Sequence, residues 1–148
     1  MRIAPLLTLL GMSVLISGCA SVPAAAQSQV AATKVAETTF RNKSFTMSWI
    51  PSFGTLPDIA FLAASARQPS VMAVDLAQLL NAGRTNDTYV VVAGPSSAMS
   101  SQVLLDALKV AHNPLPHLHV LYIGSEVATE KVTQALRRAG ATFVAPRT

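Results

Sequence analysis

The sequence predicts an α/β fold in which a parallel β-α-β-α-β half follows one edge strand and two helices. Residues 89–93 and 120–123 are continuously apolar, which is typical of parallel strands covered on both faces. Residues 96–112 and 125–140 carry apolar side chains at helical spacing. With a last strand in residues 142–146, right-handed crossovers would fold this array into a small three-layer sheet.

The elements before this half follow from shorter patterns. The segment SFTMSWI, residues 44–50, alternates large apolar with small polar side chains, which predicts a half-buried strand at the margin of the sheet. Two helices are expected next, at about residues 57–67 and 71–82. Ser70 is placed to cap the second helix and Gly83 to end it.

The chain begins with MRIAPLLTLLGMSVLISGCA, which has one early positive charge, an apolar stretch over residues 3–16 and then small residues. The stretch is too short for a membrane-spanning helix, which needs about 20 apolar residues. These proportions are typical of a secretory leader that is removed from the mature protein. We therefore expect residues 1–18 to be a signal peptide.

The only cysteine follows this leader directly, in the pattern Ile16-Ser17-Gly18-Cys19. A lone cysteine can also be a packed core residue or the end of a membrane anchor. The four-residue pattern, however, resembles the lipobox of bacterial lipoproteins. That resemblance implies that the leader is cut before Cys19, that its sulfur receives a diacylglycerol and that the new amino terminus is acylated. Ala20, where aspartate favours inner-membrane retention, then implies an outer-membrane anchor.

Residues 20–39 are rich in alanine, serine, threonine and glutamine and contain few large apolar side chains. Such a segment cannot bury much surface, which favours a flexible tether. An alanine-rich helix from about Gln29 is the competing interpretation. The predicted organisation is therefore a lipidated cysteine with a tether over residues 19–39 and a single α/β domain over residues 40–148.

Charge and histidine content argue against two kinds of partner. Eleven basic and seven acidic side chains give a net charge of +4, and no run of five or more basic residues occurs, so nucleic-acid binding is not expected. His112, His117 and His119 lie close together, but they lack the further cysteine or carboxylate ligand that a metal site requires. We therefore expect no bound metal.

Sequence signatures of catalysis are also missing. There is no GxSxG motif, no second cysteine and no pair of carboxylates with glycosidase spacing. The dinucleotide fingerprint GxGxxG and the phosphate loop GxxxxGK[ST] are absent as well. The sequence therefore predicts a protein that is not an enzyme and has no cofactor.

Two glycine-serine turns are the candidates for a ligand site. Gly94, Ser96 and Ser97 follow one predicted core strand, and Gly124 and Ser125 follow the next. Ligands of parallel sheets gather at the carboxyl ends of strands, where helix amino termini present unpaired N–H groups. The competing interpretation is that glycine makes a tight turn and serine caps a helix. Both interpretations place these residues at the same edge of the sheet.

The remaining feature is the turn WIPSFG, residues 49–54, which carries the rings of Trp49 and Phe53. Loops that present aromatic side chains are where contacts with partners concentrate. Trp49 and Phe53 are therefore the candidates for binding a protein partner. An alternative for aromatic residues in this part of the chain is that they fill the core beneath an edge strand.

Together these patterns predict a lipoprotein anchored in the outer membrane and facing the periplasm of a bacterial cell envelope. We expect it to bind a protein partner, as an accessory or assembly factor of a secretion, conjugation or pilus machine. In its layout alone, it resembles small lipoproteins that serve such machines. The alternative is a module that binds a small ligand or an anion, and an enzyme with an unfamiliar site is the least favoured class.

Overall fold

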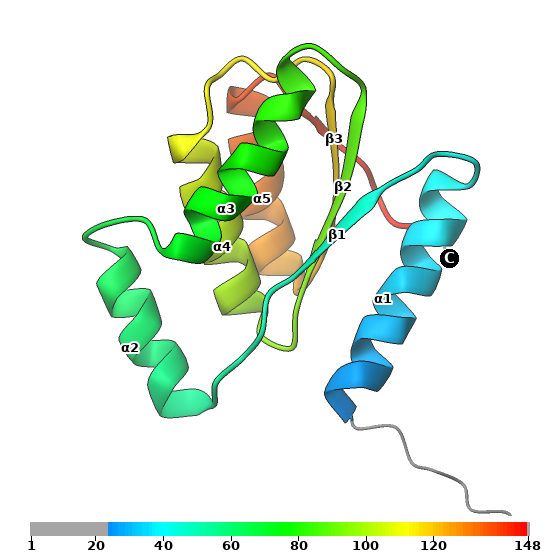
Figure 1. Ribbon diagram of the computed structural model, residues 1–148. Helices are drawn as coiled ribbons and strands as arrows, with labels where there is room; N and C mark the ends of the chain where they lie inside the picture. The colour runs from blue at the N-terminus through cyan, green and yellow to red at the C-terminus, as the bar shows by residue number, and fades with distance from the viewer. Residues whose placement is uncertain (1–23, 148) are drawn as a thin grey trace, which may run out of the picture.

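The computed structural model describes residues 24–147, which form an α/β fold with a four-stranded sheet (Figure 1). Its helices and strands alternate along the second half of the chain, as the sequence predicts. In chain order the elements are α1 (Ala24–Phe40), β1 (Thr46–Trp49), α2 (Thr55–Ser65), α3 (Val71–Asn81), the short 3-10 helix η1 (Ala82–Arg84), β2 (Thr88–Ala93), α4 (Ser97–Val110), β3 (Leu118–Ile123), α5 (Glu126–Arg138) and β4 (Thr142–Phe143).

The sheet is entirely parallel, and its strands lie in the order β1-β2-β3-β4. The predicted α/β class and its parallel half are therefore confirmed. β1 is an edge strand, as expected, and the structure adds that it runs parallel to β2. Trp49 pairs with Ala93, which pairs with Ile123, so the carboxyl ends of β1, β2 and β3 are level.

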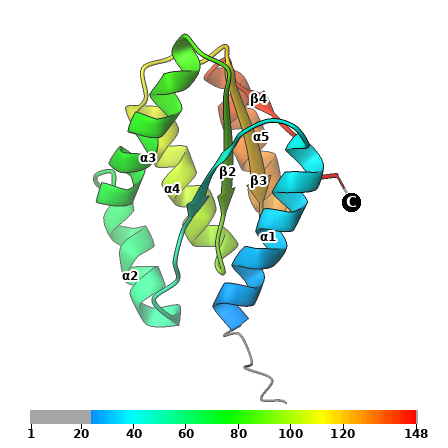
Figure 2. The same cartoon turned by 45° about the vertical axis from the view of Figure 1, so that its right-hand side comes forward.

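The larger core lies between the sheet and the helices that connect its strands. α3, α4 and α5 cover this face, and α3 packs closely on α4 (Figures 1 and 2). Alternate residues of the central strands point into it, because successive side chains of a strand face opposite ways. The fully buried members from the strands and helices include Val90, Val92, Val120, Tyr122, Leu80, Met99, Leu104, Val132 and Leu136.

The opposite face of the sheet is covered by α1, which packs on the side chains of Val91 and Leu121 (Figure 2). Ala32, Ala36 and Phe40 form a buried stripe at a spacing of four residues along this helix. The alanines bring the helix close to the sheet, and the sheet itself supplies the larger apolar side chains. This helix completes the predicted three layers.

The flexible tether predicted over residues 19–39 is therefore wrong from Ala24 onward. Alanine has the highest helix propensity of all residues, so a segment with few large side chains still forms a helix where a sheet offers an apolar surface. The competing prediction of an alanine-rich helix from about Gln29 was closer, although α1 begins five residues earlier. Residues 19–23, including Cys19, lie outside the described part of the chain, as does the predicted leader.

Within residues 24–147, none of the helices is both long enough and apolar enough to span a bilayer.

Candidate partner-binding surface

The free edge of β1 presents backbone groups that have no partner strand in the described sheet. The Ile50 N–H donates to the Ala93 carbonyl at 2.8 Å, which directs the polar groups of Ile50 toward β2. Backbone groups of neighbouring residues in a strand point in opposite directions along the sheet. The N–H and C=O groups of Met47 and Trp49 therefore point away from β2, along the open edge.

An apolar groove of about 260 Å³ lies beside this edge, between β1 and α3. Its β1 side consists of residues 47–50, and its α3 side includes Met72, Leu76 and Leu79. Asp75, which is exposed, gives the groove one acidic side chain. An open strand edge next to an apolar groove is the arrangement with which proteins bind an extended peptide as an additional strand.

Trp49, one of the two predicted partner-binding residues, occupies the carboxyl end of β1 and is half-buried. It lines the groove beside α3 and also a second cleft, of about 270 Å³, on the α1 side of the sheet. The other walls of that cleft are the first half of α1 and the ends of β2 and β3, at Ala93 and Ile123. Trp49 therefore belongs partly to the packing of α1 and partly to the surface.

Phe53, the second predicted residue, lies in the loop after β1, and 59% of its surface is exposed. The loop is fixed by the buried carboxylate of Asp58 in the first turn of α2. This carboxylate accepts hydrogen bonds from the Ser52 hydroxyl at 2.6 Å and from the Phe53 N–H at 2.9 Å. Gly54 starts the helix with a φ of +104°, a conformation that favours glycine. The exposed Phe53 ring is thus held on an ordered loop.

Two residues that the sequence analysis did not single out extend this apolar surface. Leu56 and Ile59 of α2 are 78% and 58% exposed, whereas Phe61 and Leu62 turn toward the core. The sequence contains an indication of this exposure, because α2 is apolar around most of its circumference. A helix with one buried face needs only one apolar stripe, so some of its apolar side chains must be exposed. α2 projects from the body of the molecule (Figure 1).

The glycine-serine turns are brought together at the carboxyl edge of the sheet. Ser96 caps α4 by accepting from the Met99 N–H, and Ser125 caps α5 by accepting from the Ala128 N–H. The Ser97 hydroxyl accepts from the Ser125 N–H at 2.9 Å, which joins the two turns. The hydroxyl groups of Ser96, Ser97 and Ser125 and the Ser125 N–H are therefore engaged in contacts within the turns.

The two glycines in these turns are required by close packing. A Cβ atom on Gly94 would collide with the carbonyl oxygen of Ile50, and one on Gly124 would collide with the hydroxyl end of Tyr122. The Tyr122 hydroxyl in turn donates to the Ser97 carbonyl at 3.0 Å and lies 3.2 Å from the Ser100 hydroxyl. These contacts explain the glycines by packing and require no bound ligand.

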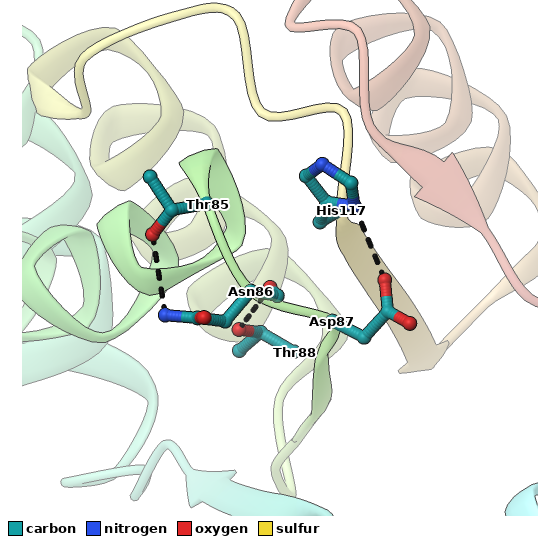
Figure 3. Close-up of polar contacts among 5 residues, drawn as sticks. All are labelled: Thr85, Asn86, Asp87, Thr88 and His117. Carbon is teal, nitrogen blue, oxygen red and sulfur yellow. Dashed lines mark hydrogen bonds and ion pairs between the residues drawn. The ribbon is translucent and has the colours of Figure 1, made fainter.

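The three histidines do not form one site. His117 Nδ1 lies 3.2 Å from a carboxylate oxygen of Asp87 at the amino edge of the sheet, where Thr88 also bonds to the Asn86 carbonyl (Figure 3). His119 stacks on the ring of Tyr89 at 4.7 Å, on the α1 face. Within residues 24–147, no group of three or more His, Cys, Asp or Glu side chains is arranged to hold a metal ion.

Comparison of the chain with protein-family models, curated proteins and solved structures finds no match.

Proposed function

We propose that this chain is a lipoprotein, anchored through Cys19 in the outer membrane, that binds a protein partner in the periplasm by adding the partner's strand to β1. The observation that carries the binding mode is the open edge of β1, with the backbone groups of Met47 and Trp49 beside an apolar groove. Main-chain hydrogen bonds would give such a contact its affinity, and the groove would select side chains. The role is that of an accessory or assembly factor of an envelope machine.

β1 is a better site for strand addition than the opposite edge. β4 contains only Thr142 and Phe143, which pair with His119 and Val120. Exposed edges carry a risk of unwanted pairing, and proteins usually keep them short or protect them. β1 has four residues and a groove along its side, so it can hold a longer segment in register.

The groove defines the chemistry of the partner. Alternate side chains of an added strand would enter the space between β1 and α3, where Met72, Leu76 and Leu79 require apolar partners. Asp75 would favour a lysine or arginine near one end of that strand. A lipid anchor raises the local concentration of the protein at the membrane, so a modest contact at one edge strand is sufficient for recruitment there.

A proline substitution tests the binding mode, because proline removes the outward N–H of an edge residue without removing a bond to β2. We expect Met47→Pro to abolish a photocrosslink between a probe at the exposed Thr46 and its partner in the native cells. Met47→Ala is the matched control, since it also removes the side chain but keeps the N–H, and it should retain the crosslink. An equal loss in both variants would contradict backbone pairing. A probe at the exposed Gln134 on α5 reports non-specific adducts.

A further inference from the structure

We propose that Phe53, Leu56 and Ile59, here called the α2 tip, contact the lipid bilayer to which Cys19 anchors the chain. This inference rests on the proposed lipid anchor, and it assigns a role to a surface that strand addition at β1 does not use. It also fixes how the domain is oriented on the membrane.

The α2 tip has the composition of a surface that meets lipid. Each of its three residues is more than half exposed, and they follow one another at intervals of three, from the loop after β1 into the first turns of the projecting helix α2. Asp58 is the only charged residue between Ser44 and Ser65, and it is buried with its carboxylate bonded to the loop. No exposed charge in residues 44–65 therefore opposes transfer of this surface into the bilayer interface.

The α2 tip lies at the same end of the molecule as the beginning of α1. Both views show α1 and α2 starting beyond the carboxyl ends of the strands, on either side of the sheet (Figures 1 and 2). The cleft that joins the first half of α1 to Trp49 and the ends of β2 and β3 agrees with this placement. Val30 in α1 and Val127 in the first turn of α5 add exposed apolar side chains at this end.

The short segment between Cys19 and α1 is the reason for proposing that the α2 tip contacts the bilayer. Five Cα–Cα steps separate Cys19 from Ala24. A chain of that length spans at most about 18 Å even when fully extended. An acylated Cys19 would therefore hold the start of α1 close to the lipid headgroups, and the α2 tip at the same end would be held there with it.

The resulting orientation is compatible with strand addition. β1 runs toward the bilayer, so its free edge and the groove beside α3 remain open to the side. The amino edge of the sheet, with the exposed Arg84, Asp87 and His117, faces away from the membrane. The charged amino edge thus faces water, and the apolar α2 tip faces lipid.

A fluorophore at the α2 tip tests this contact. Mature acylated protein carrying Leu56→Cys, labelled with NBD, is reconstituted in vesicles of phosphatidylethanolamine and phosphatidylglycerol. Acylation leaves Cys19 without a free thiol, and Leu56 is exposed, so the label reports one position and the core stays intact. The matched control is Arg84→Cys at the opposite end. We expect blue-shifted emission and quenching by nitroxide lipids at position 56, and neither effect at position 84.

Three results would overturn the inference, and they are distinguishable. One result is that a water-soluble quencher reaches positions 56 and 84 equally in protein whose Cys19 acylation is established by mass spectrometry. This result would contradict the lipid contact of the α2 tip but not the lipid anchor on Cys19. Energy transfer between labelled copies that is lost on dilution with unlabelled protein, while the blue shift persists without quenching by nitroxide lipids, would assign the α2 tip to a second copy. Mass spectra that show no acyl chain on Cys19 would instead contradict the proposed anchor itself.

Discussion

Asp58 gives the sharpest test of how the surface after β1 is built. Asp58 is only 8% exposed, and its carboxylate accepts two hydrogen bonds from the loop that carries Phe53. Hydrogen bonds to a charged group contribute about 1.5–3 kcal/mol each. Ser52 and Phe53 are exposed, however, so water would replace the carboxylate as their acceptor in a variant, and each bond then contributes only about 0.5–1 kcal/mol, as an ordinary hydrogen bond does. We expect Asp58→Ala to cost about 2 kcal/mol in total, with the first-turn helix-dipole contribution included.

This cost should be local, because α2 projects from the body and only part of it packs on the core. Elements with few buried contacts open without global unfolding. A loss of about 2 kcal/mol corresponds to roughly 30-fold faster amide exchange in α2, at 1.4 kcal/mol per factor of ten. Hydrogen exchange read by mass spectrometry should show this acceleration in α2, whereas β2 and β3 keep their protection.

Asp58→Asn is the matched control, since its amide oxygen can still accept from the Phe53 N–H. We expect a smaller acceleration than in Asp58→Ala. Unchanged exchange in α2 of the alanine variant would show that the carboxylate does not hold the loop. An equal acceleration in β2, β3 and α2 would show that α2 opens only with the whole domain, and the reasoning would then be refuted.

Three further predictions concern the anchor and the β1 surface. Cys19→Ser should give an unprocessed or soluble product on fractionation, and unchanged processing and membrane association would contradict the lipobox. Gly94→Ala should lower the free energy of unfolding by about 1–3 kcal/mol in denaturant titrations, because its Cβ collides with the Ile50 carbonyl; a neutral result would contradict that packing. Trp49→Ala should abolish partner capture in crosslinking while unfolding stays cooperative, since the ring is only half-buried. Loss of the fold in that variant would assign Trp49 to the core.

The sequence predicts the parallel half well because its signals are local and agree with one another. The continuous apolar runs of β2 and β3 alternate with helical periodicity in α4 and α5, and Ser70, Ser96 and Ser125 cap the helices that follow them. β1 was placed at the margin of the sheet by its alternating pattern and by its position before that half. These features do not depend on contacts between distant parts of the chain.

What the sequence did not predict depends on such contacts. α1 reads as a tether because its buried stripe contains two alanines and only one large side chain, Phe40. This stripe is stable as a helix because Val91 of β2 and Leu121 of β3 give it an apolar surface to cover. The joining of the two turns by Ser97 and the Ser125 N–H spans 28 residues, so no local pattern reveals it. The exposure of Leu56 and Ile59 follows from how α2 leaves the core, which periodicity alone does not specify.

The most direct test of the central claim is the register of crosslinks along β1. Photoreactive probes at Thr46 and Ser48, which lie two residues apart on the same side of the strand, are crosslinked to the partner and the adducts are mapped by mass spectrometry. Strand addition predicts that the two probes mark partner residues two positions apart within one extended segment. Adducts scattered over several segments of the partner, or formed equally well with Met47→Pro, would contradict the account.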